Sequence, residues 1–504
     1  MKNRLKKFLN LTACFMAILS MSACGNNNDD SSNKTESNST EKDYDLLVYN
    51  SDSDIADEFE KMCNEYSSRT GVIIKGVTAD PEKDNMEQLR SYMKLTNPPN
   101  VFTVNNMQEL KEWQDSGCIL DFSNATQENF KEMANNIPET FRLSSNTVDS
   151  FGVPCTIQGY GYLVDPKILS SLFGGDKYRS VLNDLKECTY EEFEGMIHAL
   201  DVYIDNGQVY RFTLNGNDYS LLAEKSGLAE NLNGVFSFAG GDTTLTGSCL
   251  ANVALSSVFK TAADANVAAN EKIDLLGSPL IKFMQALDLI TSSVSGKNGG
   301  VSRGISLVNN TTNSTNQAMK NFVSGKSVFM VGGNWEYDTI AVYDSSVARR
   351  LVFLPIKMPL LGDDIKAEGI TEKKLATSIP VYVPRYYSIN ARSTELEQKL
   401  AQDFLVWVKT SELGEKYLLQ EFGYIPYDIK DSTVIDNPLS RSMIEYVTSE
   451  KVIPGVYYGA PTNWCNDTLG KYIAEQYYTK ISWSYSDYEK VSDYAISKWK
   501  EMRK

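Results

Sequence analysis

Histidine is almost absent from this 504-residue chain, and basic residues are fewer than acidic ones. The only His is His198, and 49 Lys and Arg stand against 65 Asp and Glu, a formal net charge of −16. A single His argues against His-rich metal sites and His-based acid–base dyads, although carboxylate chemistry stays open. We expect His198 to pack on a helix. The acidic balance argues against a nucleic-acid partner, because a protein that tracks phosphates carries a basic patch.

No pair of the eight cysteines has the CxxC spacing, which argues against a zinc site. Beyond Cys14 and Cys24, six are spread along the chain: Cys63, Cys118, Cys155, Cys188, Cys249 and Cys465. Six cysteines so far apart do not form a disulfide scaffold, and their pairing stays open. The sequence predicts neither a metal nor a cofactor.

The first 23 residues have the layout of a secretory signal peptide. A basic start with four Lys and Arg precedes an apolar run over residues 8–19, which is shorter than a membrane span of about 20 residues. The run ends in Met21-Ser22-Ala23-Cys24, which resembles a bacterial lipobox with Met21 in place of the usual Leu. The resemblance implies that Cys24 is lipidated (palmitate) and becomes the mature N-terminus. An ordinary signal peptide with an incidental Cys is the alternative.

The segment that follows Cys24, residues 25–43, is polar and contains no aliphatic or aromatic residue. Such a segment buries no core, so we expect a flexible tether and a folded body from Tyr44. Loss of residues 1–23 removes four basic residues and no acidic one, which brings the net charge to −20. The pattern predicts an exposed protein held on the outer face of a bacterial cytoplasmic membrane.

The folded body is long enough for two or more domains. A buried strand is expected at 45–49, a helix with one apolar face from Ile55 to Tyr66, and a second strand at 72–74. This βαβ order predicts an α/β fold with a mostly parallel sheet, whose ligands lie beyond the carboxyl ends of the strands. Another strand is expected at 101–104.

Two further segments carry capping boxes, Thr189 with Glu192 and Thr394 with Glu397, which predict helix starts. The apolar face of the second helix is expected to comprise Leu396, Leu400, Phe404 and Trp407. Residues 240–316 have a weak helical pattern with long connections. No repeat of 20–50 residues is evident, which argues against a solenoid.

Residues 322–335 (FVSGKSVFMVGGNW) predict a helix end, a turn at Gly325, a buried strand, and two glycines that expose Trp335. The Gly-Lys-Ser triplet in this segment is not a phosphate loop. That motif needs Gly where Lys320 stands, and it opens a helix where this triplet precedes a strand.

This segment resembles the hallmark of family 1 extracellular solute-binding proteins, the maltose-binding-protein-like receptors of ABC sugar importers. Other family motifs follow in order: Pro98-Pro99-Asn100-Val101 with Asn for the usual Asp, Gly117–Phe122, Phe151-Gly152-Val153-Pro154, Thr189–Phe193, Tyr387–Trp407, and Tyr424-Ile425-Pro426. Together the motifs span residues 44 to about 475.

The resemblance implies a two-lobe α/β fold, like type II periplasmic binding proteins, with strands that cross a hinge. Carried over, the first lobe comprises 44–155 and 388–435, and the second comprises 156–387 and 436–504. It implies a carbohydrate ligand, which we expect to be an oligosaccharide, because Asn-rich loops and several aromatic residues suit one. It also implies a membrane permease as partner, no catalysis, and a monomer.

A sugar presents hydroxyl edges, which polar side chains bind, and C–H faces, which prefer an aromatic plane. Trp335 matches the family's stacking Trp, and Trp464 lies where relatives place another. The full set of expected ligand-binding residues is Asn50, Asp52, Asn105, Asn106, Gln108, Gln158, Tyr160, Asn217, Asp218, Tyr219, Trp335, Glu336 and Trp464. Capping, turn or core packing is the structural alternative for each.

Three other functions stay open. The same fold can bind a non-sugar solute such as a polyol phosphate, a peptide or an organic anion, although Arg349-Arg350 is the only adjacent Arg pair. A surface glycosidase needs two carboxylates about 5–10 Å apart, and the acidic sequence singles out no such pair. A surface adhesin without transport is the third.

Overall fold

A five-stranded sheet organises the first part of the folded body. The structure is a computed structural model that describes residues 42–294 and 303–503, so the predicted signal peptide, Cys24 and most of the tether lie outside the described residues. The strand order is β2-β1-β3-β12-β4. The bounds are β1 (Leu46–Asn50), β2 (Ile74–Thr78), β3 (Val101–Val104), β4 (Val153–Pro154) and β12 (Tyr386–Ile389).

The βαβ unit predicted at the start is present. β1 pairs in parallel with β2 and β3, and all five of its residues are buried, as suits a strand covered on both faces. The connecting helix α1 (Ala56–Thr70) buries Phe59, Met62 and Tyr66 and ends at Gly71 with φ +78°. β2 begins at Ile74, so the strand predicted at 72–74 was placed too early, because Ile73 is 53% exposed.

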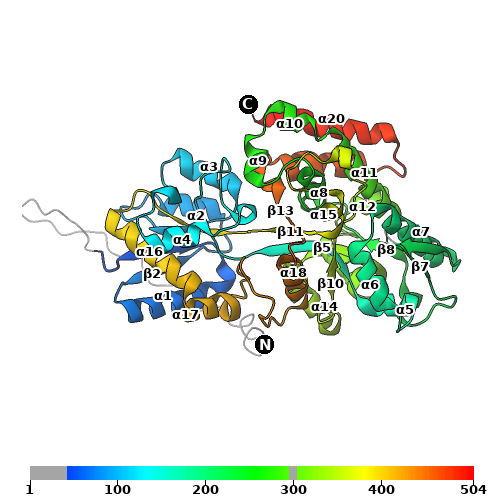
Figure 1. Ribbon diagram of the computed structural model, residues 1–504, viewed down its shortest axis with the longest axis horizontal. Helices are drawn as coiled ribbons and strands as arrows, with labels where there is room; N and C mark the ends of the chain where they lie inside the picture. The colour runs from blue at the N-terminus through cyan, green and yellow to red at the C-terminus, as the bar shows by residue number, and fades with distance from the viewer. Residues whose placement is uncertain (1–41, 295–302, 504) are drawn as a thin grey trace, which may run out of the picture. The chain divides into compact units, whose positions relative to one another are not determined.

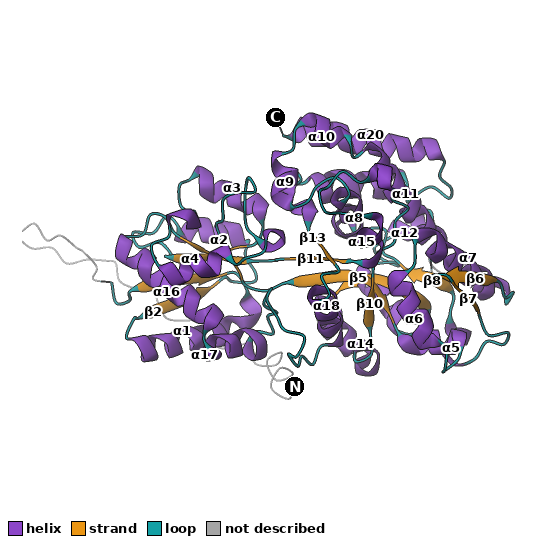
Figure 2. Cartoon of the chain, viewed as in Figure 1, coloured by secondary structure: helices purple, strands orange, loops and turns teal. Residues whose placement is uncertain are grey.

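A six-stranded sheet organises the second part, in the order β13-β11-β5-β9-β8 with β10 also paired to β5. The bounds are β5 (Gln158–Val164), β8 (Gly234–Ser237), β9 (Ser327–Gly333), β10 (Val352–Leu354), β11 (Ile379–Tyr382) and β13 (Val452–Pro454). β8 is parallel to β9 and β11 to β13, while β5 runs antiparallel to β9 and β11. Figure 2 shows helices on both sides of the strands.

The remaining helices and the hairpin belong to two groups. Around the first sheet the helices are α1, α2 (Asn85–Tyr92), α3 (Met107–Asp115), α4 (Glu128–Asn135), α16 (Glu395–Thr410) and α17 (Glu412–Lys416). The segments around the second sheet are α5 (Pro166–Phe173), α6 (Tyr178–Glu187), α7 (Tyr190–Asn206), the hairpin β6 (Arg211–Leu214) and β7 (Asn217–Ser220), α8 (Ala251–Ser256), α9 (Ala262–Val267), α10 (Asn270–Asp274), α11 (Gly277–Ser292), α12 (Ile305–Val308), α13 (Thr315–Val323), α14 (Tyr337–Ala348), α15 (Glu372–Thr377), α18 (Pro438–Thr448), α19 (Lys471–Gln476) and α20 (Tyr485–Met502).

Both predicted capping boxes are confirmed, at Thr189–Glu192 before α7 and at Thr394–Glu397 before α16. The predicted apolar face of α16 is wrong at Leu396, which is 65% exposed. The fully buried apolar residues of α16 are Ala401, Phe404, Leu405 and Val408, and the predicted Leu400 and Trp407 are partly buried against the same core.

Three segments carry the chain between the sheets, at 155–157, 383–385 and 426–437. β5 follows the first crossing, and β11 precedes the second. The two strands are antiparallel neighbours and appear side by side in Figure 1. The first crossing is also bonded to the residue just before the third, since Ile157 N–H donates to the Ile425 carbonyl at 2.8 Å. Residues 44–504 form one compact unit, and the lobe boundaries stay a prediction.

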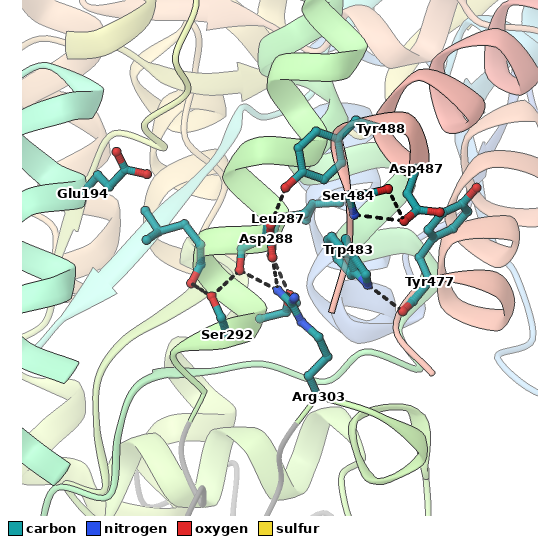
Figure 3. A network of polar contacts seen from close by, with 12 residues as sticks. Glu194, Leu287, Asp288, Ser292, Arg303, Tyr477, Trp483, Ser484, Asp487 and Tyr488 are labelled. Atoms are coloured by element: carbon teal, nitrogen blue, oxygen red, sulfur yellow. Dashed lines mark hydrogen bonds and ion pairs between the residues drawn. The ribbon is translucent and has the colours of Figure 1, made fainter. Parts of the chain in front are cut away.

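The C-terminal helix α20 is fastened to α11 by a polar network around Asp288 (Figure 3). The Arg303 guanidinium forms an ion pair with Asp288, donates to the Thr291 hydroxyl at 2.7 Å, and lies 4.2 Å from the Trp483 ring centroid. The Tyr488 hydroxyl donates to Asp288 from α20. The network therefore holds the last helix, α20, against α11 in the second part of the fold.

Candidate functional site

Aromatic side chains gather where strands of the second sheet end. Trp335 follows the carboxyl end of β9, Tyr382 ends β11, and Tyr457 and Tyr458 follow β13, while Tyr160 lies near the start of antiparallel β5. These ends share one edge of the sheet, which is where ligands of α/β sheets bind. We call these five residues the aromatic cluster.

The rings of the aromatic cluster are in contact with one another. Trp335 lies 6.3 Å from Tyr160 and 6.0 Å from Tyr382, and Tyr382 lies 5.6 Å from Tyr458, as distances between ring centroids. The Tyr382 hydroxyl donates to Gln158 Oε1 at 2.9 Å, so both residues predicted on β5 lie here. Tyr160 is fully buried, whereas Trp335 is 38% exposed and offers ring surface to solvent.

Trp335 owes its position to the glycine that ends β9. A Cβ on Gly333 would come 2.1 Å from Trp335 Cζ3, so any other residue there would displace the indole. The Trp335 Nε1–H donates to Glu336 Oε1 at 3.1 Å, which fixes the ring from its other side. The predicted exposure of Trp335 by the two preceding glycines is therefore present, with a direct steric reason at Gly333.

Two carboxylates follow neighbouring parallel strands of this sheet. Asp242 follows β8, the parallel neighbour of β9, and Glu336 follows Trp335. Burial raises the pKa of the Glu336 carboxyl above its ordinary value and the field of Asp242 raises it further, against the lowering effect of the Trp335 N–H. Both carboxylates also act on the Cys249 thiol, which places Cys249 in the same region.

The polar atoms of the predicted residues after β1 already form hydrogen bonds and an ion pair within the protein. Asn50 is fully buried and donates to the Asp52 carbonyl at 2.8 Å, while its Oδ1 accepts from Asp52 N–H. Asp52 forms an ion pair with Arg385 of the 383–385 crossing and accepts a 2.6 Å hydrogen bond from the Tyr424 hydroxyl. Asp52 therefore fastens the 383–385 crossing to the first sheet, and Asn50 bonds to the backbone of Asp52.

Of the predicted residues after β3, Asn105 and Asn106 have structural roles, and Gln108 joins the first part of the fold to the second. Asn105 donates to Glu109 Oε1 at 3.0 Å, and Asn106 caps α3. Gln108 Nε2 donates to the Ala460 carbonyl at 3.3 Å, which joins α3 to the segment after β13. Burial raises the pKa of Glu109, whose oxygens accept from Asn105.

A pocket lies between the two sheets beside this contact. Asn106 and Met107 line it from the first part, and Tyr382, Gly455 and Tyr458 from the second. Its cavity volume is about 30 Å³, about the space of one water molecule.

Four predicted ligand residues lie elsewhere. Asn217, Asp218 and Tyr219 are in the β6–β7 hairpin, where Tyr219 donates to Asp184 at 2.6 Å and its ring contacts Phe173 and Phe212. Trp464 is fully buried, donates to the Ala495 carbonyl at 2.8 Å and packs on Trp499. The stacking role predicted for Trp464 is wrong in this structure, because its ring belongs to the core.

Tyr382, Tyr457, Tyr458 and Asp242 are not among the residues predicted from the sequence. A signal existed for the Tyr pair, since it lies two residues beyond the short apolar run Val452-Ile453-Pro454. Asp242 lies in the region 240–316, whose weak pattern hid the end of β8.

Within residues 42–294 and 303–503 no group of three or more His, Cys, Asp or Glu side chains is placed to hold a metal ion. The six cysteines of that part of the chain are free thiols. Over the same residues, no helix is long and apolar enough to span a bilayer.

Comparison with known proteins places the fold. The family model described as bacterial extracellular solute-binding protein matches residues 55–430. RafE from Streptococcus pneumoniae is similar in structure, with a TM-score of 0.59 and 16% identity over 91% of this chain and 98% of its own. A family 1 extracellular solute-binding protein from Bifidobacterium longum subsp. infantis has a TM-score of 0.58 and 16% identity, over 90% and 98% of the two chains.

A third solved structure, a cyclo/maltodextrin-binding protein complexed with maltotetraose, has a TM-score of 0.53 and 14% identity, covering 92% of this chain and 98% of that one. The sequence has no significant match among curated proteins. The structural matches confirm the predicted two-lobe α/β fold.

Proposed function

This chain belongs to the bacterial extracellular solute-binding protein family, and we propose that it is the receptor of an ABC importer for a sugar or oligosaccharide. The observation that carries the proposal is Trp335, a partly exposed indole seated on Gly333 among four tyrosines at the ends of the strands. An aromatic plane of this kind binds the C–H face of a sugar ring. RafE has been solved in complex with raffinose, and the maltodextrin-binding protein with maltotetraose.

The hydroxyl edges of the sugar find polar partners next to that plane. Glu336 borders the indole, and Gln158 is joined to Tyr382. Asn106 lines the pocket at the start of α3, and Gln108 contacts Ala460. Asn50 and Asp52 stay in the proposed set of ligand residues, although their polar atoms bind the protein itself here. Among the predicted ligand-binding residues, we favour Gln158, Trp335 and Glu336.

Capture follows from the two-part architecture. The lobes we propose, 44–155 with 388–435 and 156–387 with 436–504, turn about the three crossing segments. A ligand that contacts both lobes only when they approach shifts the population toward the closed form. That form docks on the permease, which takes the sugar, and the receptor carries out no chemical step.

The N-terminal sequence supports a place at the membrane surface. We propose that residues 1–23 are removed, that Cys24 is lipidated, and that residues 24–43 tether a monomeric receptor to the outer face of the cytoplasmic membrane. A diacylglycerol with a further acyl chain exceeds the two-signal threshold for stable anchoring. Mass spectrometry of the N-terminal peptide from cells checks this, and an unmodified Cys24 would refute the anchor.

The function is tested by calorimetry with a panel of mono- and oligosaccharides. We expect binding without product, at least about 100-fold weaker in Trp335→Ala, because the stacking plane is lost. Tyr485→Ala, at a 57% exposed Tyr on α20, is the control and keeps full affinity. Tight binding of an anion with no saccharide bound would favour the non-sugar receptor, and steady hydrolysis would favour a glycosidase.

A further inference from the structure

The pocket between the two sheets carries a positive charge that the chain does not neutralise. Two of the residues that line this pocket are charged, Glu139 and Arg142. The Glu139 carboxylate is paired with Lys260, whose Nζ lies 2.8 Å from Oε2. Within the described residues, Arg142 forms no ion pair with an Asp or Glu. The lining of the pocket therefore presents one guanidinium without a counter-charge.

The same guanidinium lacks hydrogen-bond acceptors. Its Nη2 donates to the Ile137 carbonyl at 3.2 Å, and this is the one hydrogen bond of the Arg142 side chain in residues 42–294 and 303–503. Its Nε is buried and has no acceptor there. An Arg presents five N–H donors in a planar fork that matches the two oxygens of a carboxylate. A buried donor without an acceptor costs free energy, which favours a ligand that supplies acceptors at this point.

The backbone at Arg142 is held in place by the core of the first part. Phe141 and Leu143, the residues on either side of it, are buried. The Ser144 hydroxyl donates to the Asp149 carboxylate at 2.7 Å, which ties down the loop that follows. The fold therefore fixes the position of Arg142, as a binding residue requires.

The segment that carries Arg142 contacts the second part of the fold on both sides of that residue. The Glu139–Lys260 ion pair lies before it, and after it the Asn266 side-chain amide donates to the Ser145 carbonyl at 3.0 Å. These contacts place Arg142 at the junction of the two lobes we propose, where a ligand held by both lobes would meet it.

The pocket also joins Arg142 to the aromatic cluster. Tyr382 and Tyr458 line the pocket from the second part of the fold. The ring centroid of Tyr382 lies 6.0 Å from that of Trp335. A saccharide of two or more units that stacks on Trp335 can therefore extend past Tyr382 toward Arg142.

The other carboxylates near the cluster do not cancel this charge. Glu109 of α3 acts on the Tyr458 hydroxyl, but its oxygens accept hydrogen bonds from Asn105, and burial raises its pKa. Glu336 accepts from the Trp335 indole, and burial raises its pKa as well. A raised pKa favours the neutral carboxyl. Neither Glu109 nor Glu336 lines the pocket.

We infer that Arg142 is a ligand-binding residue that sets substrate class: the saccharide carries a carboxylate, as a uronic acid does, and Arg142 binds it while Trp335 stacks on a sugar ring. The inference rests on the proposed function and names its substrate class. A carboxylate supplies both the acceptor oxygens and the counter-charge that Arg142 lacks, whereas a neutral sugar supplies hydroxyls alone. The acid enters while the lobes are apart and meets Arg142 as they approach.

The first test compares neutral and acidic sugars that share one skeleton. Calorimetry is run on glucose with glucuronate, galactose with galacturonate, mannose with mannuronate, and the 1,4-linked disaccharide of each. In the pair that binds best, we expect the acid to bind at least about 10-fold more tightly, because hydrogen bonds between charged groups are the strong ones.

Two results of this comparison are distinguishable failures. A neutral saccharide of the wider panel that binds as tightly as the best acid, or more tightly, would overturn the inference and leave the proposed function standing. If no saccharide binds, neutral or acidic, the proposed function fails and the inference fails with it.

The second test changes the residue. Arg142→Gln should bring the acid and its neutral partner within about 3-fold, because it weakens the acid and leaves the neutral sugar nearly unchanged. Arg142→Lys keeps the charge without the planar fork, so we expect a reduced preference, and this variant decides if Arg142→Gln does not fold. Arg349→Gln, at an exposed position at the end of α14, is the matched control and keeps the full preference. Full preference in either Arg142 variant would overturn the inference.

A direct readout comes from phenylglyoxal, a reagent that modifies arginine guanidinium groups. Peptide mass spectrometry measures its reaction at Arg142 with no sugar, with the neutral sugar and with the acid, at equal occupancy of the protein. We expect the acid to slow modification of Arg142 several-fold more than the neutral sugar does, and neither to change modification of Arg349. Equal modification of Arg142 with the two sugars would refute contact between Arg142 and the carboxylate.

Discussion

The indole of Trp335 occupies the space beside Gly333, where a Cβ would come 2.1 Å from the ring. Gly333 is the last residue of β9 and pairs with Tyr160 of β5, so the ring stands at the end of a fully buried strand. Position and orientation of the indole therefore depend on the absence of one methyl group. The glycine at position 333 thus lets the Trp335 indole lie at the end of the strand with part of its surface exposed to solvent.

Gly333→Ala should displace the indole and weaken saccharide binding at least about 10-fold, with an overpacking cost of about 1–3 kcal/mol in the free energy of unfolding. Calorimetry and urea unfolding measure the two effects. Gly195→Ala in α7 is the control, because nothing lies within 4 Å of its Cβ. Unchanged affinity in Gly333→Ala would show that the indole position does not matter.

Trp464→Leu and Trp335→Leu should have opposite profiles. Trp464 is fully buried on Trp499, so its replacement should cost about 3 kcal/mol of folding free energy while the remaining native protein binds saccharide normally. Trp335→Leu should lose binding and change stability by less than about 1 kcal/mol. Thermal unfolding and calorimetry on both variants decide, and weak binding by folded Trp464→Leu would return Trp464 to the site.

Asp52→Ala should destabilise the protein by about 2 kcal/mol, because it leaves Arg385 without its carboxylate and the Tyr424 hydroxyl without its acceptor. Asp115→Ala is the control. Its ion pair with Lys111 is largely exposed, so we expect a change within about 0.5 kcal/mol. Equal urea midpoints for the two variants would contradict a role for Asp52 in holding the crossing segments.

Arg303→Ala should cost about 3 kcal/mol, since it leaves Asp288 unpaired in the network of Figure 3 and removes the cation from the Trp483 ring. Hydrogen exchange should rise first in α20, which Tyr488 joins to Asp288. Arg69→Ala breaks an exposed pair with Glu65 on α1 and should leave α20 protected. Protection of α20 that is the same in both variants would contradict the network's role.

The raised pKa of Glu336 predicts a pH dependence of stability. The folded state binds a proton at this carboxyl more tightly than the unfolded state, so the contribution is favourable at low pH. It is lost as the pH rises from the ordinary value of 4.5 through the raised pKa. Asp242 and Cys249 are the titratable groups that face it.

Glu336→Gln should therefore flatten the stability curve in that window and match or exceed the parent at pH 7. Thermal unfolding between pH 4 and pH 8 measures the difference. Glu415→Gln, at an exposed position of α17, should follow the parent curve. A Glu336→Gln curve parallel to the parent throughout would show that the carboxyl titrates normally.

Local elements followed closely from the sequence because their signals act over a few residues. Thr189 with Glu192 and Thr394 with Glu397 fixed two helix starts, and Gly71 ended α1. The periodicity failed at Leu396, because spacing identifies a helix face without showing how far the neighbouring layer extends. The family resemblance, carried by residues 322–335, supplied the fold that these local signals do not specify.

By itself, the sequence determined that Trp335 and Trp464 each follow an Asn and stand near a predicted strand or helix end. Tertiary structure alone decided that one is presented to solvent and the other buried. Trp464 is covered by Trp499 and bonded to Ala495, which α20 brings back from 31 residues further along the chain. The Trp335 ring contacts Tyr160 and Tyr382 and its indole N–H donates to Glu336, while Trp335 stays 38% exposed at the end of β9.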